Sequence, residues 1–267
     1  RDRLRSRGLG DVYKRQGPTI SLQKMYEDGD KRRMWVYMTQ GDYYPKLATA
    51  QGGYTYKLIN SDADGEEIEG RIEMNAHIKK YLIGKSADCD GMVGINQDAA
   101  NNIYLMRLAD VYLTYVEAVM GAADQTSDAT AMKYYNMVRQ RAGVPEAGSV
   151  TYEELLKERR RELAFESQTW FDTQRYRYRV GDAKALEWLN NGFGTGINRC
   201  AMYIPNGNLD KTQENDPANY KMVSSTDEGS MYNPIMITAG AFQAPVPAAV
   251  TSSSPMMGLD PVDYYAE

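Results

Sequence analysis

Apolar residues in the middle of the chain recur every three or four positions, which is the spacing of an α-helix. Tyr104–Met120 is apolar almost all round, and its polar residues fall three, four and three positions apart. They are Arg107, Asp110, Thr114 and Glu117. Because they form one narrow stripe, the pattern predicts a helix whose other faces are covered by protein. We expect Asn101 or Asn102 to cap its start and Gly121 to end it.

A second amphipathic pattern predicts a helix over Ala129–Ala142. Ser127 or Asp128 can cap its start, and Gly143 and Pro145 end it. Its apolar stripe consists of Ala131, Tyr134, Tyr135, Val138 and Ala142. Since a short polar turn separates the two helices, we predict an antiparallel helical hairpin, the size of one tetratricopeptide unit.

A third helix begins with a capping box, in which the side chains of Thr151 and Glu154 each bond the other residue's amide. We expect this helix to run to about Phe171, with Trp170 and Phe171 closing its end. Its centre, Lys157–Glu162, is heavily charged. Arg159 or Arg160 lies near the apolar stripe, so we expect a partly buried, paired guanidinium. A structural ion-pair network is the first interpretation, and an anion site is the alternative.

The flanking regions are less regular. Gly17–Ser86 mixes turn residues with β-like runs at Met34–Thr39 and Tyr54–Ile59. From Gly181 onward the chain is rich in loop residues, with one further helix indicated at Ala183–Leu189. We therefore predict a mainly α fold, in which tetratricopeptide-like helical hairpins accompany an irregular, loop-rich half with a few short strands.

Composition narrows the possible functions. The net charge of −5 argues against a general nucleic-acid scaffold, and the chain has only one His and two Cys among 267 residues. These counts argue against a His-rich metal site, a zinc cluster and a disulfide-dense scaffold. The sequence contains no stretch of eighteen apolar residues, which is the length that would indicate a membrane span.

The first sixteen residues differ from the rest. Arg1–Gln16 carries six basic and two acidic residues, and the remainder has a net charge of −9. From its charge alone, this segment would be a basic arm that binds nucleic acid or anionic lipid. However, Asp11–Gln16 resembles the translation of a transposon end used in sequencing libraries. We therefore expect residues 1–16 to be a non-native read-through segment and residues 17–267 to form the domain.

Several ordered motifs in the chain resemble those of the SusD/RagB family. The helical ones are Arg107–Leu113 with Glu117-Ala118, Asn136–Gly143, and Glu158–Glu166 followed by Trp170-Phe171-Asp172 and Arg175-Tyr176. Asp28–Arg32 resembles the family's acidic-Arg turn, with Lys31 where a Pro is usual. Pro245-Val246-Pro247 resembles the family's closing segment. Val116 replaces the common Ala before Glu117, which packing tolerates.

This resemblance implies the C-terminal part of a single SusD/RagB-like domain in a lipoprotein exposed at the outer membrane of Bacteroidetes-type bacteria. Such proteins bind glycans, or sometimes peptides, and deliver them to a SusC-like TonB-dependent transporter. They are not enzymes and use no cofactor. The resemblance also implies that the lipid anchor and earlier hairpins belong to an upstream part. Neither Cys89 nor Cys200 lies in a leader-like apolar context, so we expect neither to be the anchor.

An aromatic cluster provides the candidate binding residues. Six of the 23 residues from Met34 to Tyr56 are aromatic, and the glycines between them indicate loops. Because sugars present flat C–H faces to aromatic rings, we select a ligand-binding group from this cluster. The group is Trp35, Tyr37, Tyr43, Tyr44 and Tyr54. Core packing is the alternative interpretation for each ring.

Other candidate chemistry is weaker. Gly192–Gly196 is glycine-rich but follows no strand, and the acidic residues of Asp62–Glu67 lack the glycine spacing of an EF-hand. His77 has no partner motif, and no pair of carboxylates indicates a glycosidase. We therefore expect no catalytic or metal site. Non-catalytic glycan binding is the leading hypothesis, a protein-interaction scaffold is the alternative, and a carbohydrate-active enzyme is the third.

Overall fold

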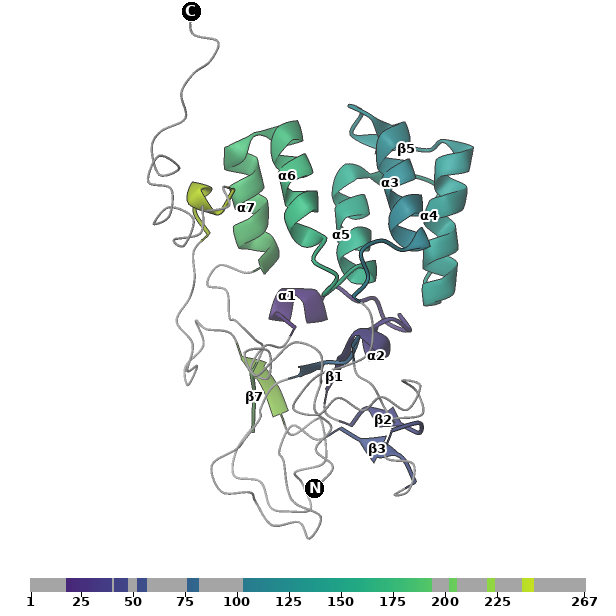
Figure 1. Ribbon diagram of the computed structural model, residues 1–267, viewed down its shortest axis with the longest axis vertical. Coiled ribbons are helices and arrows are strands. Elements are labelled where there is room, and N and C mark those ends of the chain that lie inside the picture. The colour runs from purple at the N-terminus through teal and green to yellow at the C-terminus, as the bar shows by residue number, and fades with distance from the viewer. Residues whose placement is uncertain are drawn as a thin grey trace, which may run out of the picture. The chain divides into compact units, whose positions relative to one another are not determined.

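The structure is a computed structural model that describes residues 18–39, 41–47, 52–56, 76–81, 103–193, 202–205, 220–223 and 237–242. The chain divides into two compact units, Arg1–Met236 and Ile237–Glu267. The described part of the second unit contains a 3₁₀-helix, Ala239–Phe242. All other elements belong to the first unit (Figure 1).

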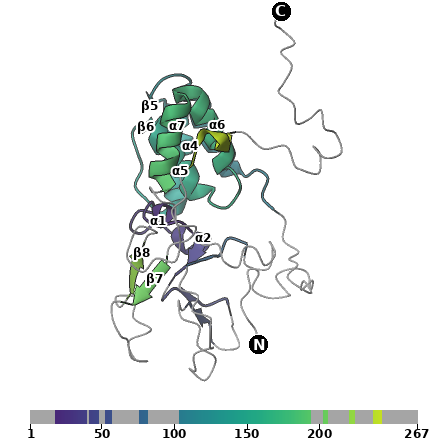
Figure 2. The same ribbon diagram turned by 90° about the vertical axis from the view of Figure 1, so that its left-hand side faces the viewer.

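Five helices of the first unit lie side by side in the order α7, α6, α5, α3, α4 (Figure 1). Turned by 90°, the same helices overlap, so they form one layer (Figure 2). Their bounds are Leu108–Met120 (α3), Ala129–Ala142 (α4), Tyr152–Glu162 (α5), Thr169–Val180 (α6) and Asp182–Phe193 (α7). In the described ranges, no helix is long and apolar enough to cross a bilayer.

The α3–α4 hairpin confirms the prediction. The carboxylate of Asp128 caps α4 by accepting hydrogen bonds from the amides of Thr130 and Ala131, at 3.0 and 2.9 Å. Gly143 ends α4 in the left-handed conformation, with φ of 79°. Between the helices, the rings of Tyr112 and Tyr134 stack at 4.8 Å. Beside them, β5 (Gln125–Thr126) pairs antiparallel with β6 (Val150–Thr151).

The start of α3 corrects the sequence analysis. The helix begins at Leu108 rather than Tyr104, and Arg107 is its N-cap residue. The expected caps, Asn101 and Asn102, lie outside the described residues. Arg107 precedes the helix with extended backbone, and its guanidinium bonds Glu162 at 3.0 Å and Glu166 at 2.7 Å. We attribute the late start to these tertiary contacts, which hold Arg107 outside the helix.

One face of α3 is also less covered than we expected. Its buried side is formed by Ala109, Leu113, Val116 and Met120. On the other side, four large apolar residues are exposed: Leu108, Val111, Tyr115 and Val119. They follow one another at helical spacing, so they form a continuous stripe, called here the α3 stripe.

The third predicted helix is two helices. We expected it to reach Phe171, but α5 ends at Glu162 and α6 starts at Thr169. Phe165 and Ser167 interrupt it with positive φ angles of 64° and 61°, which are incompatible with a right-handed helix. Phe171 is exposed in the first turn of α6 and closes no helix end.

One of the two hydrogen bonds expected for the capping box of α5 is formed. The Thr151 hydroxyl accepts from the amide of Glu154 at 3.2 Å, whereas the Glu154 carboxylate bonds Lys157 at 2.6 Å instead of reaching back. At one end of the layer, α7 is longer than predicted and packs against α6. A short helix, α1 (Ile20–Gln23), contacts α7.

The irregular half is described in short pieces. Where we predicted one strand over Met34–Thr39, a helical turn, α2 (Arg33–Val36), is followed by β1 (Tyr37–Met38). Each strand pairs antiparallel with one other, β1 with β4 and β2 with β3. The bounds are His77–Ile78 (β4), Tyr43–Tyr44 (β2) and Tyr54–Thr55 (β3). A further pair is β7 (Met202–Pro205) with β8 (Tyr220–Val223).

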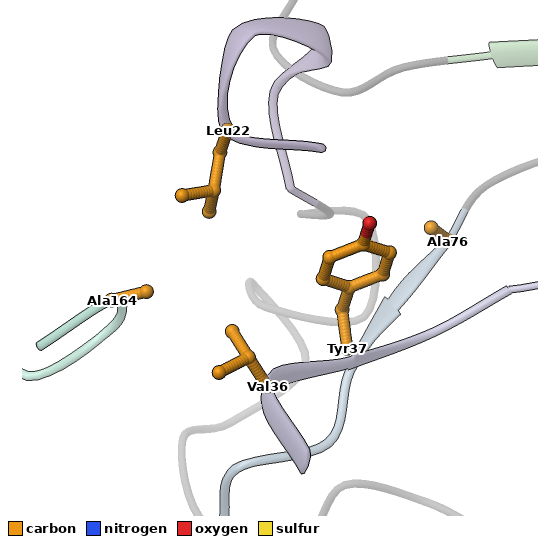
Figure 3. Close-up of a cluster of buried hydrophobic side chains, with 5 residues drawn as sticks. All are labelled: Leu22, Val36, Tyr37, Ala76 and Ala164. Atoms are coloured by element: carbon orange, nitrogen blue, oxygen red, sulfur yellow. The ribbon is translucent and has the colours of Figure 1, made fainter. Parts of the chain in front are cut away.

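A small apolar cluster joins this half to α5 (Figure 3). The ring of Tyr37 lies with Leu22, Val36, Ala76 and Ala164, and Ala164 is the second residue after α5.

Ion pairs around α5 connect this helix with the turn before α2 and with α3, α4 and α6. They form two groups, one around Glu158 and Glu162 and one around Arg159, which we together call the buried network. Its members are Asp30, Arg32, Arg107, Asp110, Arg139, Glu158, Arg159, Arg161, Glu162, Glu166 and Asp172. Glu158 is 0% exposed and bonds Arg32, Arg139 and Arg161 at 2.6, 3.0 and 2.6 Å. Arg159 is 1% exposed and bonds Asp110 at 2.8 Å and Asp172 at 2.9 Å. The predicted buried, paired arginine is thus confirmed.

The buried network predicts an unequal response to two similar substitutions in α5. Glu158→Gln should lower the free energy of unfolding by about 3–5 kcal/mol, because it removes a buried negative charge that three guanidiniums share. Glu154→Gln removes an exposed ion pair on the same helix and should cost less than about 1 kcal/mol. Urea unfolding of both variants measures the difference. Equal losses would show that Glu158 is not a structural charge.

Stability should fall in acid. Burial alone would raise the pKa of Glu158, but Arg32 and Arg161 bring it below its ordinary 4.5, and Arg141 and Arg107 do the same for Glu162. A lowered folded pKa adds stability that is present above the unfolded value and is lost as the pH falls through the folded one.

Burial raises the pKa of Asp172, which opposes this trend in part. We expect the urea midpoint to decrease steadily below about pH 4.5, with a shallower decrease in Glu158→Gln. A midpoint that is constant or higher in acid would contradict the assignment.

Candidate functional site

The exposed aromatic rings of the predicted group lie on α2 and on the β2–β3 hairpin. Trp35 is 66% exposed on α2, and Tyr43 is 50% exposed on β2. Tyr54 is half-buried on β3, where it pairs with Tyr44 across the hairpin. We use the name aromatic face for the accessible rings of the group, Trp35, Tyr43 and Tyr54. Because directly paired residues point to the same side of a hairpin, Tyr54 lies on the side of Tyr44 and Tyr43 on the other side.

Local backbone geometry fixes the ring of Tyr43. Its hydroxyl donates to the carbonyl of Gly52 at 2.7 Å, across the hairpin. A Cβ on Gly53 would lie 2.5 Å from the Tyr43 hydroxyl oxygen, and Gly53 has φ of 115°. Only glycine satisfies both conditions, so the Gly52-Gly53 turn allows the ring to lie along the hairpin.

The other two tyrosines of the group are buried. Tyr37 belongs to the apolar cluster of Figure 3, and Tyr44 donates its hydroxyl to Asp42 at 3.1 Å. Tyr56, which follows β3, is buried as well. These three rings are therefore packed in the interior, whereas the rings of the aromatic face are accessible. Ligand binding by the group stays a prediction.

Asp42 holds the hairpin to α2. Its carboxylate bonds Arg33 at 2.5 and 2.7 Å and accepts from the amide of Thr39 at 2.9 Å. Burial raises the pKa of the Tyr44 hydroxyl, and the Asp42 charge raises it further, so the phenol stays protonated as a donor. Burial disfavours the Arg33 cation, but Asp42 more than compensates and the pKa of Arg33 is raised. These charges stabilise the scaffold.

Lys79 is a site residue that sequence reasoning missed. Its ammonium lies 4.1 Å from the centre of the Trp35 ring and 5.1 Å from that of Tyr44. The Lys79 amide donates to the carbonyl of Val36 at 2.9 Å, which extends the β1–β4 pairing toward α2. Burial lowers the pKa of Lys79. No motif surrounds it, and only the strand register places it there.

The remaining candidates lie elsewhere. His77 is half-buried, with its ring 5.6 Å from that of Tyr56. Asp62–Glu67, Cys89, Cys200 and Pro245–Pro247 lie outside the described residues. Within the described ranges, no three His, Cys, Asp or Glu side chains come together as metal ligands.

Comparison with known proteins gives consistent matches. The model of the SusD family matches residues 14–257. A SusD-like protein of Bacteroides ovatus is 34% identical over 175 residues, which are 65% of this chain and 29% of that protein. A crystal structure with xylogluco-oligosaccharide is 28% identical, with a TM-score of 0.68 over 94% of this chain and 47% of that one. A SusD-like protein of Bacteroides fragilis shares the fold at 19% identity, with a TM-score of 0.57 over 90% and 45%.

The chain thus spans less than half the length of these relatives. The similarity to the solved structures covers the helical layer and the irregular half together, because it includes more than nine-tenths of the chain.

The Asp42 contacts predict a local effect of Asp42→Asn. An amide cannot replace the charged pair with Arg33, so the hairpin should open more often. We expect roughly tenfold faster hydrogen exchange at the amides of Gly41 and Tyr56, which bond across this turn. Asp28→Asn, at an exposed position, is the matched control and should leave exchange unchanged. Equal exchange in both variants would show that Asp42 does not hold the hairpin.

Proposed function

Because this chain belongs to the SusD family, we propose that it binds a glycan without transforming it. We propose further that the longer protein does so at the bacterial outer membrane and delivers the glycan to a SusC-like TonB-dependent transporter. The match to a protein solved with xylogluco-oligosaccharide supports the ligand class. The transporter, the surface location and the lipid anchor rest on the family resemblance alone.

The aromatic face is the observation that carries the proposal. Trp35 and Tyr43 expose large rings, although burying them would be favourable by roughly 1.5–3 kcal/mol each. Both stand on fixed supports, because Asp42 joins α2 to the hairpin and Gly52 holds the Tyr43 hydroxyl. Rigid, exposed rings suit the C–H faces of sugars, since little side-chain entropy is lost on binding.

The carboxylate beside this face supports a non-catalytic role. Hydrolysis of a glycosidic bond uses a pair of carboxyl groups on either side of the bond. Asp42 is buried, and its oxygens are already bonded by Arg33, Thr39 and Tyr44. The enzyme hypothesis requires release of shorter products from a bound glycan. We expect chromatography after long incubation to show none.

The α3 stripe favours a second candidate function, a protein-interaction scaffold. A run of exposed apolar side chains on one helix is typical of a contact surface. Under this alternative, the chain has no affinity for any glycan and the α3 stripe is its only functional surface. Glycan titration therefore separates the two candidates.

We expect Trp35→Ala and Tyr43→Ala each to weaken binding of a xylogluco-oligosaccharide roughly tenfold or more, because each removes one ring of the aromatic face. Trp170→Ala is the control, since it removes another exposed tryptophan, on α6. Isothermal titration measures all four proteins, and a panel of other polysaccharides extends the search. The aromatic assignment fails if the unaltered chain binds a glycan and both face variants bind it equally well.

A further inference from the structure

In the part of the chain that the structure describes, Lys79 differs from the cations beside it in having no carboxylate partner. Arg33 pairs with Asp42 at 2.5 Å, Arg32 pairs with Asp30 at 2.7 Å, and Lys80 pairs with Glu166. For Lys79, by contrast, the described contacts of the ammonium are with the rings of Trp35 and Tyr44. The chain has more acidic than basic residues, yet the contacts of this half-buried cation within the described ranges are with rings.

The position of this cation matters because it adjoins the aromatic face. With the Lys79 ammonium 4.1 Å from its ring centre, Trp35 is still 66% exposed. Because the ammonium already lies over the ring, a sugar that rests on the open part of the indole reaches the ammonium with a substituent that extends past the ring edge. Tyr44 is buried and its hydroxyl is bonded to Asp42, so it acts as a fixed wall.

We propose that Lys79 and Trp35 form a subsite for a sugar that carries an anionic group, a carboxylate or a sulfate. The indole receives the C–H face of the sugar, and the ammonium pairs with the anion. This inference rests on the proposed function of the aromatic face, and it adds a charge preference that the face alone does not have.

The local electrostatics agree with this subsite. Cation–π contact stabilises the ammonium less than a charge-assisted hydrogen bond does. Burial lowers the pKa of Lys79, which means that the charged ammonium is less stable here than in water. An anionic ligand would supply the missing counter-charge, and this gain exists only in the bound state.

The test compares charged sugars with matched neutral ones. One arm uses an oligogalacturonate and its carboxyl-reduced form, and the other uses a sulfated galactan oligosaccharide and its desulfated form. We expect the chain to bind the charged member of at least one pair about tenfold more tightly. The arm that shows this preference identifies the anionic group. Lys79→Met should abolish the preference, so that the charged and the neutral member of the pair bind with equal affinity.

Two variants and one stability measurement complete the design. Lys79→Arg keeps the charge and should retain the preference, and Lys133→Met removes an exposed lysine of α4 and should change nothing. Equal urea midpoints show that Lys79→Met is folded. Equal binding of charged and neutral sugars by the unaltered chain, or a preference that survives Lys79→Met, would overturn the subsite and leave glycan binding intact. Binding of a xylogluco-oligosaccharide but of neither pair would overturn the subsite alone, and binding of no glycan at all would overturn the proposed function as well.

Discussion

A buried carboxylate must be paired, and in this chain that requirement organises the fold. Glu158 is removed from water and is held by guanidiniums from three elements, the turn before α2, α4 and α5 itself. An unpaired charge in such a position would cost several kcal/mol. The elements must therefore meet in one arrangement. Arg159 extends the same constraint to α3 and α6 through Asp110 and Asp172.

This constraint reaches the candidate site through α2. Arg32 belongs to the buried network, Arg33 holds Asp42 on the β2–β3 hairpin, and Trp35 lies on the same short helix. Two arginines in succession thus connect the helical layer to the aromatic face. An α2 of only four residues has little stability of its own, so its position depends on these tertiary contacts. We infer that Trp35 is presented by the network rather than by a free loop.

Sequence reasoning succeeded where local signals decide the structure. The bounds of α4 were predicted to the residue, because Asp128 and Gly143 are strong caps. It failed where tertiary contacts decide. Arg107 lies outside α3 because its guanidinium bonds Glu162 and Glu166. Phe165 and Ser167 interrupt the third predicted helix, although neither is a glycine or proline that would have indicated a break. The aromatic group was found by composition, but only packing separates exposed Trp35 from buried Tyr37. Lys79 gave no signal, because strand register brings it to the indole.

The central claim is that a glycan binds at the aromatic face, on a scaffold fixed by buried charge. Hydrogen exchange of the whole chain, with and without a saturating xylogluco-oligosaccharide, tests it most directly. The account predicts slower exchange confined to residues 33–44 and 52–56, with the α3–α4 hairpin unchanged. Slower exchange on α3 and α4 instead, with none at α2 and the β2–β3 hairpin, would contradict it.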